Sequence, residues 1–117
     1  MSRPPGAPRD IPPPLELACL GALWGLSQGS VSEVRHAVKT VTNRELAYTT
    51  VMTVLGRLEK RQIVTRIKQG RHFVYIPIVS RETMRSRAVE ELVATYFGGS
   101  ESALLAYLRR SDGLEDA

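Results

Sequence analysis

The sequence predicts a mainly α-helical chain of the α+β class: three helices, a β-hairpin, and then two more helices. Three observations support this fold class. Apolar residues recur at helical spacing between residues 14 and 61. Two short runs rich in β-branched and aromatic residues, 63–68 and 72–76, are separated by one turn. After them come two further helical stretches, and each begins after a serine.

The first two helices are marked by their ends. We expect the first to begin near Pro14, because proline is tolerated in the first turn, and to end before the segment Ser27-Gln28-Gly29. Ser30 is the expected N-cap of the second helix, and Glu33 three residues later completes a capping box. The apolar residues of the pair are Leu17, Leu20, Leu23 and Trp24 in the first helix, and Val31, Val34, Ala37, Val38 and Val41 on one side of the second.

The third helix is expected over about residues 48–61 and is strongly amphipathic. At about 100° per residue, one face collects the apolar residues Val51, Val54, Leu55 and Leu58. The opposite face collects Thr49, Thr50, Thr53, Gly56, Arg57 and Lys60, with Met52 at its edge. By propensity alone the TTVMTV segment is also compatible with a strand. The spacing of the apolar residues fits a helix better.

The two β-prone runs form the expected hairpin, and Gly70 supplies the backbone freedom that its turn needs. Pro77 is expected to end the second strand. The fourth helix is expected from its Ser80 cap to about residue 97, and the fifth from its Ser100 cap to about residue 110. Three helices followed by a hairpin form the winged helix-turn-helix arrangement.

The threonine face of the third helix favours recognition of DNA. A helix in the major groove needs short side chains that allow close approach, and threonine offers a donor, an acceptor and a methyl group. The helix N-terminus favours phosphate, and basic side chains lie further along the helix and at the hairpin tip. The predicted DNA-binding residues are Tyr48, Thr49, Thr50, Thr53, Arg57, Lys60, Lys68, Arg71 and His72.

The distribution of charge supports a polyanionic partner for the middle of the chain. The formal net charge is +4. Residues 30–75 hold nine Lys and Arg against three Glu, whereas residues 80–117 hold five basic against seven acidic residues. We therefore expect a polyanion-binding module joined to a second unit with another task. A solvated basic surface is the alternative explanation.

Several classes of protein are disfavoured. The single cysteine, Cys19, excludes an internal disulfide, and no ligand spacing surrounds it or the two histidines, so we expect neither metal nor cofactor. We expect Cys19 to be buried as a small hydrophobic residue. No Ser/His/Asp, Cys/His or paired-carboxylate arrangement indicates an enzyme. The N-terminus lacks the apolar core of a signal peptide, and no apolar run is long enough to span a membrane, so we expect a cytoplasmic protein.

The last two helices carry more apolar residues than a small three-helix core can cover. We expect two copies to bury them against each other in a symmetric homodimer. Packing of these residues back onto the same chain is the alternative. The predicted dimer residues are Met84, Val89, Leu92, Val93, Tyr96, Phe97, Leu104, Leu105 and Leu108.

The expected domain organisation has four parts. Residues 1–13, rich in proline, form a flexible arm, and residues 14–78 form the winged helix-turn-helix domain. Residues 79–111 form the helical dimerisation domain, and residues 112–117 form a frayed acidic tail.

Three separated segments resemble the penicillinase-repressor (BlaI/MecI/CopY) family of bacterial transcriptional regulators. They are LAYTTVMTVLGRLEKRQIV, GRHFVYIPIVSRE and YFGGSESALLAYL, and the resemblance covers about residues 15–109. It implies a homodimeric repressor of double-stranded DNA that binds an inverted repeat, typically of TACA/TGTA half-sites. By similarity, Thr49, Thr50 and Thr53 match the DNA-facing positions of the family's recognition helix, and Arg71 matches the wing position after glycine.

The sequence departs from this family in two places. Copper-responsive members carry a C-terminal cysteine motif, which this chain lacks, and this argues against copper sensing. The β-lactam-responsive members are inactivated when a membrane-linked metalloprotease cuts their dimerisation domain. The corresponding stretch here, near Ala106 and Tyr107, does not repeat the Asn-Phe pair of the staphylococcal members. The resemblance therefore leaves such a protease open as a partner. A winged-helix module that docks a protein and reads no DNA sequence is the alternative function.

Overall fold

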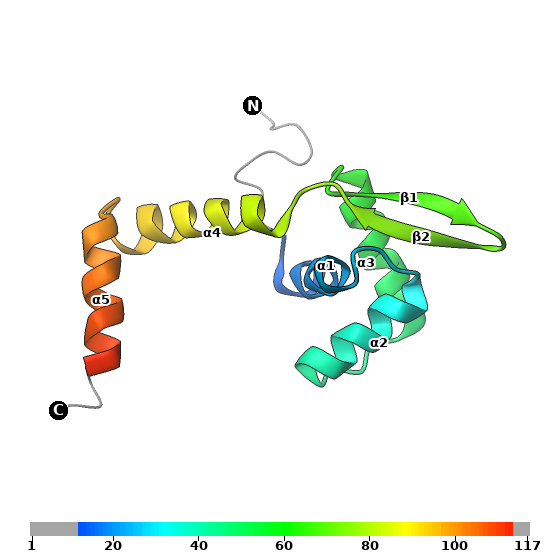
Figure 1. The fold of residues 1–117 in the computed structure, drawn as a ribbon, viewed down its shortest axis with the longest axis horizontal. Coiled ribbons are helices and arrows are strands. Elements are labelled where there is room, and N and C mark those ends of the chain that lie inside the picture. The colour runs from blue at the N-terminus through cyan, green and yellow to red at the C-terminus, as the bar shows by residue number, and fades with distance from the viewer. Residues whose placement is uncertain (1–11, 114–117) are drawn as a thin grey trace.

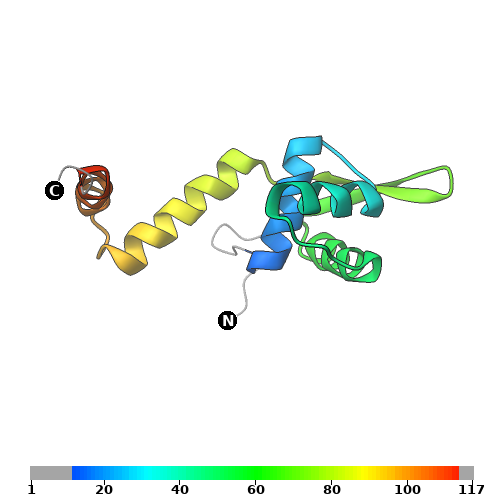
Figure 2. The ribbon, with the colours of Figure 1, turned by 90° about the horizontal axis from the view of Figure 1, so that it is seen from below.

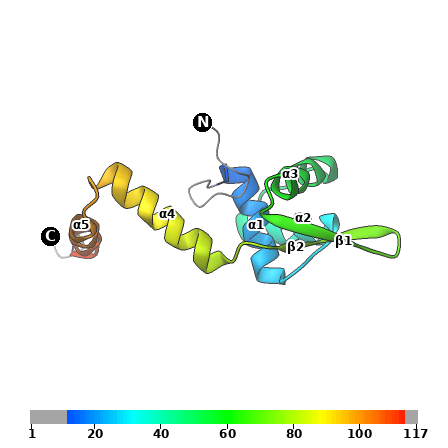
Figure 3. The ribbon, with the colours of Figure 1, turned by 90° about the horizontal axis from the view of Figure 1, so that it is seen from above.

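The computed structural model describes residues 12–113 and confirms the predicted order of elements (Figure 1). The elements are α1 (Pro14–Leu26), α2 (Val31–Thr42), α3 (Tyr48–Lys60), β1 (Val64–Gln69), β2 (His72–Pro77), α4 (Arg81–Tyr96) and α5 (Glu101–Gly113). Helices α1 to α3 pack together, and the hairpin of β1 and β2, called the wing below, extends beside α3 (Figure 3).

Pro77 ends β2, as predicted, and pairs with Val64, because a proline is tolerated at the end of a strand on the edge of a sheet. One helix end differs from the prediction by more than one residue. Helix α5 continues to Gly113, since no glycine or proline interrupts it earlier, and so takes in residues 112 and 113 of the expected frayed tail. Residues 1–11 of the expected arm and residues 114–117 lie outside the described residues.

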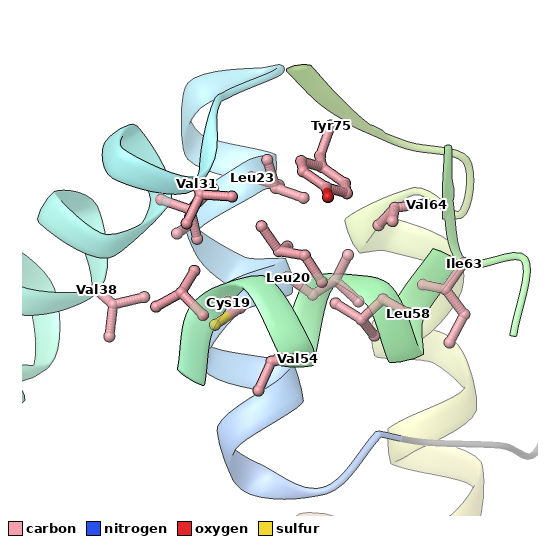
Figure 4. Packing of buried hydrophobic residues seen from close by; sticks show 14 of the residues in the cluster. Cys19, Leu20, Leu23, Val31, Val38, Val54, Leu58, Ile63, Val64 and Tyr75 are labelled. Atoms are coloured by element: carbon pink, nitrogen blue, oxygen red, sulfur yellow. The ribbon is translucent and has the colours of Figure 1, made fainter. Parts of the chain in front are cut away.

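The core lies between α1, α2, α3 and the wing, which contributes Val64 of β1 and Tyr75 of β2 (Figure 4). Leu20 and Leu23 of α1 and Leu55 and Leu58 of α3 are fully buried. Burial of each such side chain is worth about 1.5–3 kcal/mol, so this core accounts for the packing of the three helices. Val51, Val54, Leu55 and Leu58, predicted as the apolar face of α3, all lie in it.

The wing is tied to the helices by one short backbone bridge. Gly29, between α1 and α2, donates its N–H to the carbonyl of Tyr75 at 3.0 Å, and the N–H of Tyr75 donates back to Gly29 at 2.8 Å. A β-carbon at Gly29 would lie 3.1 Å from Cδ1 of Leu26, so a larger residue there would require the Leu26 side chain to shift by a few tenths of an ångström. At the tip of the wing, Gly70 has a φ of 64°, as the hairpin turn requires.

A partly buried ion pair joins α1 to the end of α3. Glu16 is 7% exposed, and its Oε1 lies 3.2 Å from Nη1 of Arg61, the C-cap residue of α3. One turn along α1, Cys19 is fully buried, as expected. Burial, with a smaller contribution from Glu16, raises the pKa of the Cys19 thiol to about 11. This thiol is therefore protonated and behaves as a small core residue.

Helix α4 leads away from the other helices, and α5 lies across its far end (Figures 1 and 2). The start of α4 is anchored on α1. Nε1 of Trp24 donates to the carbonyl of Val79 at 2.9 Å, and the guanidinium of Arg81 lies 5.8 Å from the centroid of the Trp24 ring. Met84, predicted as a dimer residue, packs instead in the core of its own chain, because it lies in this anchored first turn.

Most other apolar residues of α4 and α5 remain exposed in a single chain. Val89, Leu92, Tyr96, Leu105 and Leu108 belong to this set, and Tyr96 is 74% exposed. Val93, by contrast, is buried within the chain, and Phe97 packs against Tyr107 with ring centroids 5.7 Å apart. Packing back onto the same chain therefore covers only part of the apolar surface of these two helices.

Candidate nucleic-acid interface

Helix α3 presents the predicted threonine face away from the core. Thr49 and Thr53 are exposed and Thr50 is half-buried, whereas the apolar face of the helix is covered. Arg57 and Lys60 are exposed further along the helix. Within residues 12–113, no neighbouring atom lies within 4 Å of a β-carbon added at Gly56, so packing among these residues does not require a glycine there. This side of α3 is open to a partner.

The N-terminus of α3 has no side-chain cap. Its N-cap residue is Ala47, and no side chain accepts a hydrogen bond from the first turn. The turn before it is instead held from α2, where Nε of Arg35 donates to the carbonyl of Leu46. Free N–H groups and the positive end of the helix dipole favour an anion at this terminus.

A shallow hollow of about 240 Å³ collects the threonines. It is lined by Leu15, Thr49, Thr50, Thr53, Val54 and Arg57. Leu15 belongs to the first turn of α1, so the start of α1 lies beside the threonine face. The hollow brings together four of the predicted DNA-binding residues on one surface.

A larger groove of about 480 Å³ separates the N-terminal half of α3 from the wing. It brings the predicted residues Tyr48, Arg71 and His72 together. Its other lining residues are Ser30, Val31 and Ser32 at the start of α2, Met52 of α3, and Arg66, Phe73 and Tyr75 of the wing. Lys60 and Lys68, also predicted, are exposed but line neither this groove nor the threonine hollow.

Arg66 is the charged residue of this groove that sequence reasoning missed. Its Nε lies 3.2 Å from Oε2 of Glu59 on α3, and its guanidinium carbon lies 4.0 Å from the centroid of the Phe73 ring. The pairing register of the two strands would have identified Arg66 as a candidate. With Val64 paired to Pro77, Arg66 and Phe73 become diagonal neighbours on one face of the hairpin.

The described residues were also compared with the requirements of a metal site and of a membrane-spanning helix. Within residues 12–113, no three or more His, Cys, Asp or Glu side chains are grouped to hold a metal ion. None of the helices described is both long enough and apolar enough to cross a bilayer.

Comparison with known sequences identifies close relatives. A family model described as penicillinase repressor matches residues 13–117. The transcriptional regulator BlaI of Mycobacterium tuberculosis, in strains H37Rv and CDC 1551, is 35% identical over 105 residues. The match covers 88% of this chain and 75% of that protein.

Solved structures agree on the fold. The solution structure of the DNA-binding domain of the repressor BlaI has a TM-score of 0.53 at 25% identity, and the match covers 71% of this chain and 93% of that domain. Two more distant structures share the fold alone. BpsR of Bordetella bronchiseptica has a TM-score of 0.55 at 19% identity, covering 94% of this chain and 79% of BpsR. A MarR family protein of Bacillus stearothermophilus has a TM-score of 0.50 at 15% identity, covering 92% and 75%.

Proposed function

This chain belongs to the penicillinase repressor family, and from that premise we propose that it is a homodimeric repressor that binds an inverted-repeat operator in double-stranded DNA. The observation that carries the proposal is the exposed threonine face of α3, flanked by the basic groove of the wing. In this proposal α3 enters the major groove, where threonine side chains contact base edges.

Phosphate contacts supply most of the affinity in this proposal. Tyr48, the first residue at the uncapped N-terminus of α3, also lines the groove that holds Arg66, Arg71 and His72. A DNA strand that passes between α3 and the wing would place its phosphates against these groups. Because each neutralised phosphate releases counterions, the binding constant should fall steeply with salt.

The homodimer is supported by the apolar surface of α4 and α5. Leu105 and Leu108 are each about half exposed in a single chain, and Tyr96 is more so. Two copies that bury these residues would hold two α3 helices for successive major grooves, about 34 Å apart along the DNA. Such a pair would read an inverted repeat, and TACA/TGTA half-sites are the first sequence to test.

Release from DNA is proposed to follow cleavage of the dimerisation domain by a membrane-linked metalloprotease. A cut near Ala106 and Tyr107 would fall inside α5. It would separate Leu108 from the remainder of the dimer surface and would disturb the packing of Tyr107 on Phe97. Incubation of the purified chain with a candidate protease, followed by mass spectrometry of the fragments, tests this step.

The decisive experiment is fluorescence anisotropy with a duplex that carries the TACA/TGTA inverted repeat. A scrambled duplex of equal length is measured beside it, each at two salt concentrations. We expect a preference for the repeat that survives the higher salt. Weak and equal binding to both duplexes, abolished by salt, would contradict sequence-specific repression through this operator. Negligible salt dependence would instead favour a winged-helix module that docks a protein.

A further inference from the structure

We propose that Arg66 is a preorganised phosphate ligand, held by Glu59 and Phe73 so that its terminal nitrogens bind a DNA backbone phosphate in the groove between α3 and the wing. This inference rests on the proposed function and deepens it. Arg66 is the residue that contacts DNA, and Glu59 and Phe73 are positioning residues.

The guanidinium of Arg66 is restrained on two sides. Glu59 engages its Nε at 3.2 Å, and the ring of Phe73 covers one face at 4.0 Å from the ring centroid. In the described part of the chain, Arg66 makes no other hydrogen bond or ion pair. The two terminal nitrogens therefore keep their donors for another acceptor. The side chains of Arg66 and Glu59 are 41% and 36% exposed, so a ligand can reach them.

The surroundings of Arg66 select the chemical class of that acceptor. Arg66 lines the same groove as Arg71 and His72, and Ser30 and Ser32 line it as well. No acidic residue lines this groove. A guanidinium with two free terminal nitrogens matches the oxygens of a phosphate in a bidentate contact. A backbone phosphodiester is the ligand that fits both the charge and the position beside α3.

Glu59 has two opposing effects on phosphate binding: its negative charge repels the phosphate, and its contact with Arg66 restrains the arginine side chain. A carboxylate beside a DNA-facing arginine repels phosphate, so its removal alone should strengthen binding. A restrained arginine, however, loses less side-chain entropy when it binds, and this favours the complex. Two variants with the same net charge separate these effects. Glu59→Gln keeps an oxygen that can accept from Nε of Arg66, whereas Glu59→Ala keeps none.

The test measures operator affinity by anisotropy for the full chain and these variants. We expect Glu59→Ala to bind the operator about three- to tenfold more weakly than Glu59→Gln, the effect of one lost positioning contact. Arg66→Lys keeps the positive charge but removes the planar pair of terminal nitrogens. We expect operator affinity to fall about tenfold, with little change in the slope of log K against log salt. Arg66→Gln should lower the slope of log K against log salt by about 0.9 as well.

The matched control is an exposed ion pair between α2 and the segment before α3, whose residues do not line the groove of Arg66. Glu45 lies 3.5 Å from Lys39, and both side chains are more than half exposed. Glu45→Ala and Glu45→Gln should bind the operator equally. Thermal unfolding of each variant identifies any general loss of fold.

Two results would overturn the inference: equal operator affinity of Glu59→Ala and Glu59→Gln, or wild-type affinity of Arg66→Lys. If the wild-type chain itself shows no operator preference, the proposed function fails, which is a separate outcome.

Discussion

The indole of Trp24 donates a hydrogen bond of 2.9 Å to the carbonyl of Val79 and so links α1 to the residues that lead into α4. The two residues are 55 positions apart in the sequence. Both partners are partly buried, so the bond fixes the direction in which α4 leaves the winged helix-turn-helix domain.

Replacement of Trp24 by Phe should therefore destabilise the chain. The change removes the donor and leaves the carbonyl of Val79 without its partner, which costs about 1–3 kcal/mol. Chemical denaturation measures the change in the free energy of unfolding. Arg81→Gln, which removes only the cation above the ring, should cost less than about 1 kcal/mol. Equal losses in the two variants would show that the hydrogen bond contributes little.

Thr53→Ala should weaken operator binding more than binding to random DNA. Thr53 is exposed in the threonine hollow, and the loss of one base contact is worth about 1–3 kcal/mol of discrimination. Anisotropy with the operator and the scrambled duplex measures both affinities. Thr40→Ala, on α2 where the hydroxyl donates to the carbonyl of His36, serves as the control. Equal losses on the two duplexes would argue against base readout by Thr53.

Arg71→Ala should weaken binding to both duplexes by similar factors. Arg71 lines the basic groove, and a phosphate contact carries no sequence information. The slope of log K against log salt should fall by about 0.9. A titration at four salt concentrations measures it, with Arg109→Ala on α5 as the control. An unchanged slope would place Arg71 outside the phosphate contacts.

Leu105→Glu should convert the protein to monomers. Leu105 is exposed on α5 in a single chain, and a charge buried in an apolar dimer interface would be strongly unfavourable. Sedimentation velocity measures the oligomeric state, and operator affinity should fall with it. Arg110→Glu adds negative charge near the end of the same helix and should leave the dimer intact. A Leu105→Glu protein that remains dimeric would exclude this surface from the interface.

The buried Cys19 thiol should make stability depend on alkaline pH. Its pKa is raised from 9.0 to about 11, so the unfolded chain releases this proton first as the pH rises. The stability contributed by the protonated thiol is complete below pH 9 and is lost between about pH 9 and 11, a loss of about 2–3 kcal/mol. Denaturant unfolding at pH 8 and pH 11 should show a smaller loss for Cys19→Ala than for the wild type. Identical losses would rule out this linkage.

Local signals in the sequence were sufficient for the fold. The Ser30 and Glu33 capping box is present with both of its hydrogen bonds, and Ser80 accepts from the N–H of Thr83, so the starts of α2 and α4 were predictable from side chains alone. The amphipathic pattern of α3 likewise identified which of its faces is buried, because one helical period decides both faces at once.

Contacts between distant segments were not predictable in the same way. Glu16 reads as a surface residue of α1, yet it is buried because Arg61, 45 positions later, supplies its partner. In the sequence, Arg66 is indistinguishable from the other basic residues of this region. Only the register of the wing shows that its guanidinium lies over the ring of Phe73. Met84 carries the same apolar signal as Leu92, and only the anchoring of α4 on Trp24 decides which of them is covered.

The anchored start of α4 also makes this helix a lever. Its 16 residues span about 24 Å at 1.5 Å per residue, so a tilt of about 10° at the pivot would displace the far end by about 4 Å. That displacement exceeds the rise of one base pair, about 3.4 Å. In a dimer joined at the far ends of its two α4 helices, the angle of each α4 would set the distance between the two α3 helices. In the proposed dimer, a small change where the two α4–α5 units meet would be enough to shift one α3 helix relative to its half-site.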